Sequence, residues 1–164
     1  MGTDIHVNLE VRNKESQTWE DLSLYIKNRQ TNEFHRVECY SGRDYELFGL
    51  LAGIYRSNVE PLVDTRGLPD DLAPETHERF YCFDEDGEDC SPYWHDVTWY
   101  DMAELRAYCD SARIEKYDET ELAGFTPLSE RFRRFVYSLQ EVLDHYWIYY
   151  PRPGDARVVL WFDS

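Results

Sequence analysis

The chain has 164 residues, a length typical of one domain, and 42% of them are hydrophobic, so it can form a core without disulfides or metal. It carries 33 Asp and Glu against 17 Lys and Arg, a formal net charge of −16, which disfavours nucleic acid as a partner. The acidity is compatible with three roles: solubility, mimicry of DNA, or solvation in a high-salt proteome.

Two further absences narrow the class of protein. No apolar run approaches the ~18 residues of a membrane span, and no charged-then-apolar leader opens the sequence, so we expect no membrane partner. The four cysteines show neither CxxC nor zinc-ligand spacing, which favours reduced thiols and a cytoplasmic location. A disulfide between Cys82 and Cys90 is the alternative.

The first predicted element is a strand over Asp4–Arg12. Its residues alternate between an apolar face and a polar face, and the polar face carries Asp4, His6, Asn8, Glu10 and Arg12. A turn then predicts a partner strand near Thr18–Leu24. A further short strand is predicted around Phe34–Tyr40.

Helices are predicted from apolar spacing and capping residues. Ser41 and Asp44 resemble a capping box for a helix over Arg43–Tyr55, and Thr98 with Asp101 does the same for a second helix. The third and best-defined helix follows Thr126 and Pro127 and carries apolar residues up to Tyr146.

The remaining segments complete the predicted fold. The proline-rich stretch Glu60–Glu75 predicts a long loop, and Phe80–Phe83 a short strand. Arg157–Asp163 reads as a buried closing strand. We therefore expect one α+β domain over residues 1–164, with a small antiparallel or mixed sheet packed against about three helices.

The polar face of the first strand is the first candidate site. Asp, His and Glu are residue types that bind divalent cations or act in acid–base chemistry. Asp4 and Glu10 lie ~20 Å apart along an extended strand, so one metal cannot take both. Asp4 and His6 could form a site completed by His95 or Asp163, whereas Glu10 would be solvated or paired with an Arg. The alternative is a solvated outer face of a half-exposed strand.

Arginines suggest a second kind of site. Only three of the 17 basic residues are Lys, and Arg suits bidentate recognition of phosphate or carboxylate. Arg66 precedes Gly67 in a proline-stiffened loop, and Arg43 lies at a predicted helix start, where backbone amides favour anions. Each arginine could equally form a surface ion pair. Trp99 belongs to a group of aromatic residues that could wall a ligand site or pack in the core.

Several of these residues fall in motifs that resemble a family of small accessory proteins encoded by tailed phages and prophages. The family typically has His-Ser-x-Ser-Trp-Leu before its second helix, where this chain has His95-Asp96-Val97-Thr98-Trp99-Tyr100, so a role for a hydroxyl at position 96 does not carry over. The matching motifs span nearly the whole chain: Gly2-Thr3-Asp4-Ile5-His6 with Glu10; Trp19; Arg43-Asp44-Tyr45-Glu46-Leu47-Phe48 with Leu51-Ala52-Gly53-Ile54; Thr65-Arg66-Gly67-Leu68-Pro69-Asp70-Asp71; and His95, Trp99, Glu104 and Leu105.

The resemblance implies an accessory protein of the host cell cytoplasm and weights the motif positions Asp4, His6, Arg43, Arg66, Gly67, His95 and Trp99 as ligand-binding residues. The leading hypothesis is a non-enzymatic protein that binds a small anionic, nucleotide-type ligand, such as a host immune signal, without a cofactor. A homo-oligomer would suit it, because a shared cleft buries a small ligand better than one short sheet does. The alternatives are a metal-dependent hydrolase, for example of phosphodiesters, using Asp4, His6, His95 and a further carboxylate such as Asp163; an acidic DNA mimic that inhibits a defence enzyme; and a structural or assembly role inside the phage.

Overall fold

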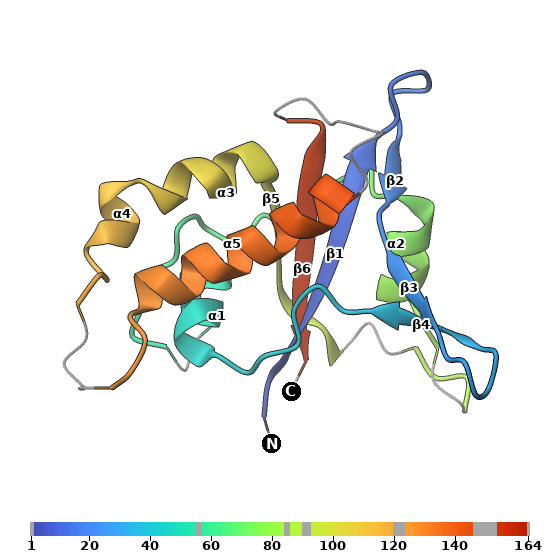
Figure 1. The fold of residues 1–164 in the computed structure, drawn as a ribbon, viewed down its shortest axis with the longest axis horizontal. Helices are drawn as coiled ribbons and strands as arrows, with labels where there is room; N and C mark the ends of the chain where they lie inside the picture. The colour runs from blue at the N-terminus through green and yellow to red at the C-terminus, as the bar shows by residue number, and fades with distance from the viewer. Residues whose placement is uncertain are drawn as a thin grey trace.

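A four-stranded antiparallel sheet crosses the centre of the structure, a computed structural model that describes residues 2–54, 57–83, 86–89, 93–119, 124–145 and 154–163 (Figure 1). The strand order is β2-β1-β6-β5. The four strands are β1 (Asp4–Arg12), β2 (Trp19–Asp21), β5 (His95–Asp101) and β6 (Ala156–Asp163).

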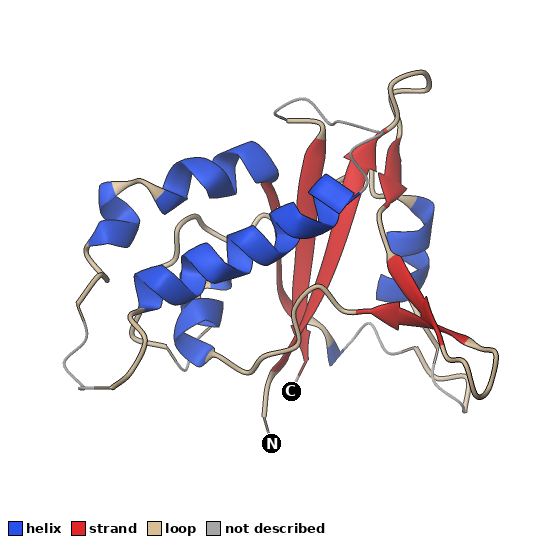
Figure 2. Ribbon diagram, in the orientation of Figure 1, coloured by secondary structure: helices blue, strands red, loops and turns tan. Residues whose placement is uncertain are grey.

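A separate two-stranded hairpin and five helices complete the described part of the chain (Figure 2). These elements are β3 (Leu24–Lys27), β4 (Phe34–Val37), α1 (Tyr45–Ala52), α2 (Pro74–Phe80), α3 (Met102–Cys109), α4 (Ala112–Glu115) and α5 (Leu128–His145). The predicted α+β class is therefore confirmed.

One face of the sheet forms the main core with α1, α3 and α5. The predicted apolar face of β1 supplies Ile5, Val7 and Leu9, and β6 contributes Val158 and Leu160 to the same core. α5 lies across this face (Figure 1) and buries an apolar stripe that includes Phe132, Phe135 and Leu139. The three- and four-residue spacing of that stripe is why this helix was the best-defined in the sequence.

The second face of the sheet is also covered, contrary to the half-exposed strand that alternation suggested. α2 and the segment before it pack there around Phe80, Val159 and Trp161. Asn8 and Glu10 of β1 are consequently buried. β1 pairs with β2 on one side and with β6 along its length on the other, so it is an interior strand.

A buried ion pair between Glu10 and Arg157 lies under the layer that covers this second face. The Arg157 side chain, 3% exposed, donates its Nε–H to Glu10 Oε2 over 2.7 Å, and Glu10 is 0% exposed. Arg157 also donates to the Asp71 carboxylate and lies over the Trp19 ring, 4.0 Å from its centroid. Glu10 Oε1 accepts the Ala73 backbone N–H. Glu10 is thus paired with an arginine, one of its two predicted states, and the pair ties the loop before α2 to the sheet.

Several predicted boundaries were wrong for identifiable reasons. Asp44, not Ser41, caps α1, accepting the Leu47 N–H. Thr98 and Asp101 lie in β5, because their neighbours continue the sheet as far as residue 101, and α3 begins only at Met102.

Two segments near the prolines also differ from the prediction. Pro74 opens α2 at its first turn, so a helix ending at Phe80 replaces the end of the predicted loop and the first residue of the strand predicted over Phe80–Phe83. The partner strand predicted near Thr18–Leu24 is confirmed only over β2, because Leu24 begins β3, which pairs with β4 in the other sheet. Tyr146 lies outside the described residues.

Candidate functional site

Asp4, His6 and Asp163 meet where β1 begins and β6 ends. The register places Asp4 opposite Asp163 and His6 opposite Trp161. Nε2 of His6 lies 3.1 Å from Oδ2 of Asp163, and the Asp4 backbone N–H donates to Oδ1 of the same carboxylate over 3.2 Å. The His6 ring stacks on Trp161 and meets Trp94 edge-on, which fixes its orientation.

Arg43 joins this end of the sheet through Asp4. Its Nε and Nη2 donate to the two oxygens of the Asp4 carboxylate over 2.5 and 2.7 Å, a bidentate pair. The hydrogen bond from Arg43 lowers the pKa of Asp4 below its ordinary value. The structure therefore brings together the predicted residues Asp4, His6 and Arg43, with Asp163 as the neighbour that the sequence also offered.

Arg66, Gly67 and Trp99 form a second group along β5. Arg66 donates to both oxygens of Glu104 over 2.8 and 2.6 Å, and its guanidinium lies 5.0 Å from the centre of the Trp99 ring. Gly67 has φ +72° and donates its N–H to the carbonyl of Val97. This loop is bound to the edge strand, and the Arg66 charge is neutralised by Glu104 rather than presented to a ligand.

His95 belongs to neither group. It pairs in the sheet with Phe162, whose side chain points to the opposite face from Trp161 and hence from His6. Its Nδ1 lies 2.7 Å from Oδ2 of Asp96, a residue with φ +50° at an irregularity in β5. His95 and Trp99 are ~13 Å apart along the strand. The seven predicted site residues therefore do not converge on one pocket.

Asp4 and His6, completed by His95 or Asp163, are the predicted divalent-cation site. Among the described residues, no group of three or more His, Cys, Asp and Glu side chains has the geometry to hold a metal ion. His6 and Asp163 are in contact, but Asp4 directs its carboxylate to Arg43. Cys39, Cys82 and Cys109 are free thiols, while Cys90 lies outside the described residues.

A cavity of about 630 Å³ lies beside Arg43, at the N-terminal end of α1. Arg131 of α5 reaches it and donates Nη1 to the Asp44 carboxylate over 2.5 and 2.6 Å, while its Nη2 donates to Glu46. Tyr45 and Phe125 supply aromatic walls. Sequence reasoning missed Arg131, Tyr45 and Phe125, because α1 and α5 are more than 75 residues apart in the chain and no local pattern links them.

Comparison with known proteins adds no relative to this description. No family model matches the chain, no curated protein matches it, and no solved structure matches it. Within the described residues, no helix has the length and apolar character needed to span a bilayer. Any function assigned to the chain therefore rests on its fold, its sequence motifs and the chemistry of its side chains.

Proposed function

We propose that this protein is a non-enzymatic binding protein for a small anionic ligand of nucleotide type, held in the cavity beside Arg43 and Arg131. The observation that carries the proposal is the meeting of two guanidinium groups and two aromatic side chains, Tyr45 and Phe125, on one cavity of about 630 Å³. Small-molecule sites commonly measure ~300–1,000 Å³ and combine apolar walls with a few directed polar groups.

Both arginines are already paired, so an anion has to replace a carboxylate. The partners available for exchange are Asp4 on Arg43 and Glu46 on Arg131, whose side chains are 48% and 61% exposed. Exposed ion pairs contribute only ~0–1 kcal/mol, so a phosphate can displace them at little cost. Arginine pairs with phosphate in the same bidentate geometry that it uses with carboxylate.

Asp44 retains its place during such an exchange. It caps α1 through the Leu47 N–H and stays bound to Arg131, so the guanidinium remains oriented when Glu46 leaves. The positive end of the α1 dipole adds to the attraction for an anion.

The resemblance to phage accessory proteins supports a host immune signal as the nucleotide-type ligand. A phage protein that sequesters a nucleotide-type immune signal would protect the phage from a host defence response. The test is to incubate the protein with cyclic di- and trinucleotides and ADP-ribose derivatives, remove unbound ligand, denature the protein and identify what is released. We expect one class to be recovered intact. Recovery of none contradicts the proposal, and recovery of a cleaved product supports the hydrolase alternative.

Two exposed variants locate the site. Arg43→Ala removes one guanidinium, and the loss of a charge-assisted bond of ~1.5–3 kcal/mol should weaken binding by about 10- to 100-fold. Phe125→Ser removes an exposed aromatic wall and should weaken binding by a smaller factor. Arg134→Ala is the matched control, because Arg134 is an exposed α5 residue whose partner is Glu130. Equal loss in Arg134→Ala and Arg43→Ala would show attraction by overall charge instead of a site.

A further inference from the structure

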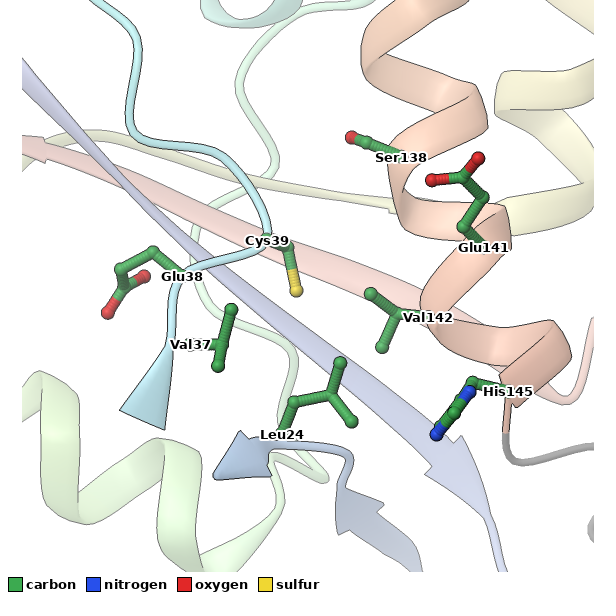
Figure 3. Close-up of a pocket in the computed structure, with 8 residues that line it drawn as sticks. All are labelled: Leu24, Val37, Glu38, Cys39, Ser138, Glu141, Val142 and His145. Atoms are coloured by element: carbon green, nitrogen blue, oxygen red, sulfur yellow. The ribbon is translucent and has the colours of Figure 1, made fainter. Parts of the chain in front are cut away.

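A second cavity, of about 310 Å³, lies between the β3–β4 hairpin and the C-terminal part of α5 (Figure 3). Leu24, Val37 and Val142 contribute apolar side chains to its lining. Glu38 and Glu141 line it from the hairpin side and from α5 respectively. The cavity is therefore an apolar hollow flanked by Glu141 and by Glu38, which forms an ion pair with Arg36.

The apolar lining continues out of the cavity along the hairpin. Leu24 pairs with Val37, and the pair two residues further along the same face is Ile26 with His35. Ile26 is 64% exposed, although a large aliphatic side chain gains free energy when it is buried. An exposed apolar face beside an apolar hollow is typical of a protein-interaction surface.

The charged side chains around the cavity indicate which kind of partner this surface can bind. The basic side chains of the two hairpin strands, Lys27 and Arg36, occupy the opposite face from Ile26, since they belong to the alternate pairs of the ladder. Arg36 is moreover turned inward, donating to the Val7 carbonyl and to Asn8, and its Nη1 pairs with Glu38 over 2.8 Å. Glu141 is exposed and forms no ion pair with any part of the chain that the structure describes. The face beside the cavity is thus apolar and negative.

We propose that this surface binds a basic amphipathic segment of a partner protein. An aliphatic or aromatic anchor of the segment fills the cavity, and a flanking Lys or Arg side chain lies opposite Glu141. A second copy of the chain, a nucleic acid or an anionic membrane is disfavoured by the net charge of −16, which repels each of them and attracts a basic partner.

The test uses a capped heptapeptide in which lysine alternates with leucine, titrated into the full-length protein and followed by calorimetry and backbone amide shifts. Two control peptides replace lysine with glutamate or leucine with serine. We expect the lysine–leucine peptide to bind at least tenfold more tightly than either control, because charge and apolar contact are both required. The largest shifts should fall on Leu24, Val37 and Val142. Equal binding of the lysine–serine peptide, or no binding of the lysine–leucine peptide at millimolar concentration, overturns the proposal.

Exposed variants provide the internal control. Glu141→Lys should weaken binding by about three- to tenfold, and Ile26→Ser should weaken it as well. Glu115→Lys makes the same change in net charge on α4, outside the cavity lining, and should change binding less than about twofold. An equal effect of Glu115→Lys contradicts a local site. A dimer of the free protein that Ile26→Ser dissociates, measured by sedimentation, would instead assign the surface to self-association and refute the proposal.

Discussion

The buried pair of Glu10 and Arg157 gives the sharpest test of how this fold is held together. Arg157→Met keeps most of the side-chain volume but removes the cation, so the Glu10 carboxylate remains at 0% exposure with the Ala73 N–H as its hydrogen-bond donor. Removing one partner of a buried pair costs ~3–5 kcal/mol, because the remaining charge is uncompensated. For a chain of this length that corresponds to a fall in Tm of about 6–20 °C.

A second substitution separates lost charge from lost packing. In the double variant Glu10→Gln with Arg157→Met, the Gln oxygen still accepts the Ala73 N–H and no buried charge is left. An unpaired amide costs ~1–3 kcal/mol, so the double variant should be more stable than Arg157→Met alone by about 2 kcal/mol. Urea unfolding followed by circular dichroism measures both. The reasoning is refuted if Arg157→Met costs less than about 1 kcal/mol, or if the double variant is no more stable than the single one.

Three further predictions concern packing and charge. Gly49→Ala should destabilise the protein by about 1–3 kcal/mol, because the new Cβ overlaps Ser57. Adding Ser57→Gly should restore stability. A gain in stability from Gly49→Ala, which an exposed helical glycine would give, contradicts the packing seen at α1. Leu139→Ala should lower the free energy of unfolding, measured by chemical unfolding, by about 2–5 kcal/mol. Tyr137→Ala on the exposed side of α5 should change it by less than about 0.5 kcal/mol. Similar losses in the two variants would mean that α5 packs through another face. Burial would raise the pKa of Asp71, but its hydrogen bond and charge contact with Arg157 outweigh this and place the pKa below the ordinary 3.8. The stability that this lowered pKa contributes is present above pH 3.8 and is lost as pH falls through the lower folded-state pKa. Asp71→Asn should therefore narrow the difference in free energy of unfolding between pH 6 and acid pH. If the pH dependence of unfolding is unchanged in Asp71→Asn, Asp71 is excluded as a contributor.

The sequence by itself determined the elements whose residues repeat with a clear period. Alternation defined β1 and its apolar face, and the uninterrupted apolar run of β6 marked a strand buried on both sides. The three- and four-residue spacing defined α5. Local rules were weaker at boundaries: the same residues that suggested a capping box at Thr98 form part of β5, because pairing with β6 outweighs a local cap.

Only the tertiary structure decided what the polar face of β1 does. Alternation places Asp4, His6, Asn8 and Glu10 on one face, but it cannot show whether another layer covers that face. α2 and the preceding loop cover Glu10, which pairs with Arg157 from the far end of the chain. Asp4 stays partly exposed and pairs with Arg43. The same limit applies to the proposed sites. Arg131 and Arg43 line one cavity, and Leu24 and Val142 line the other. Both pairs are distant in sequence, so only the folding of the chain brings them together.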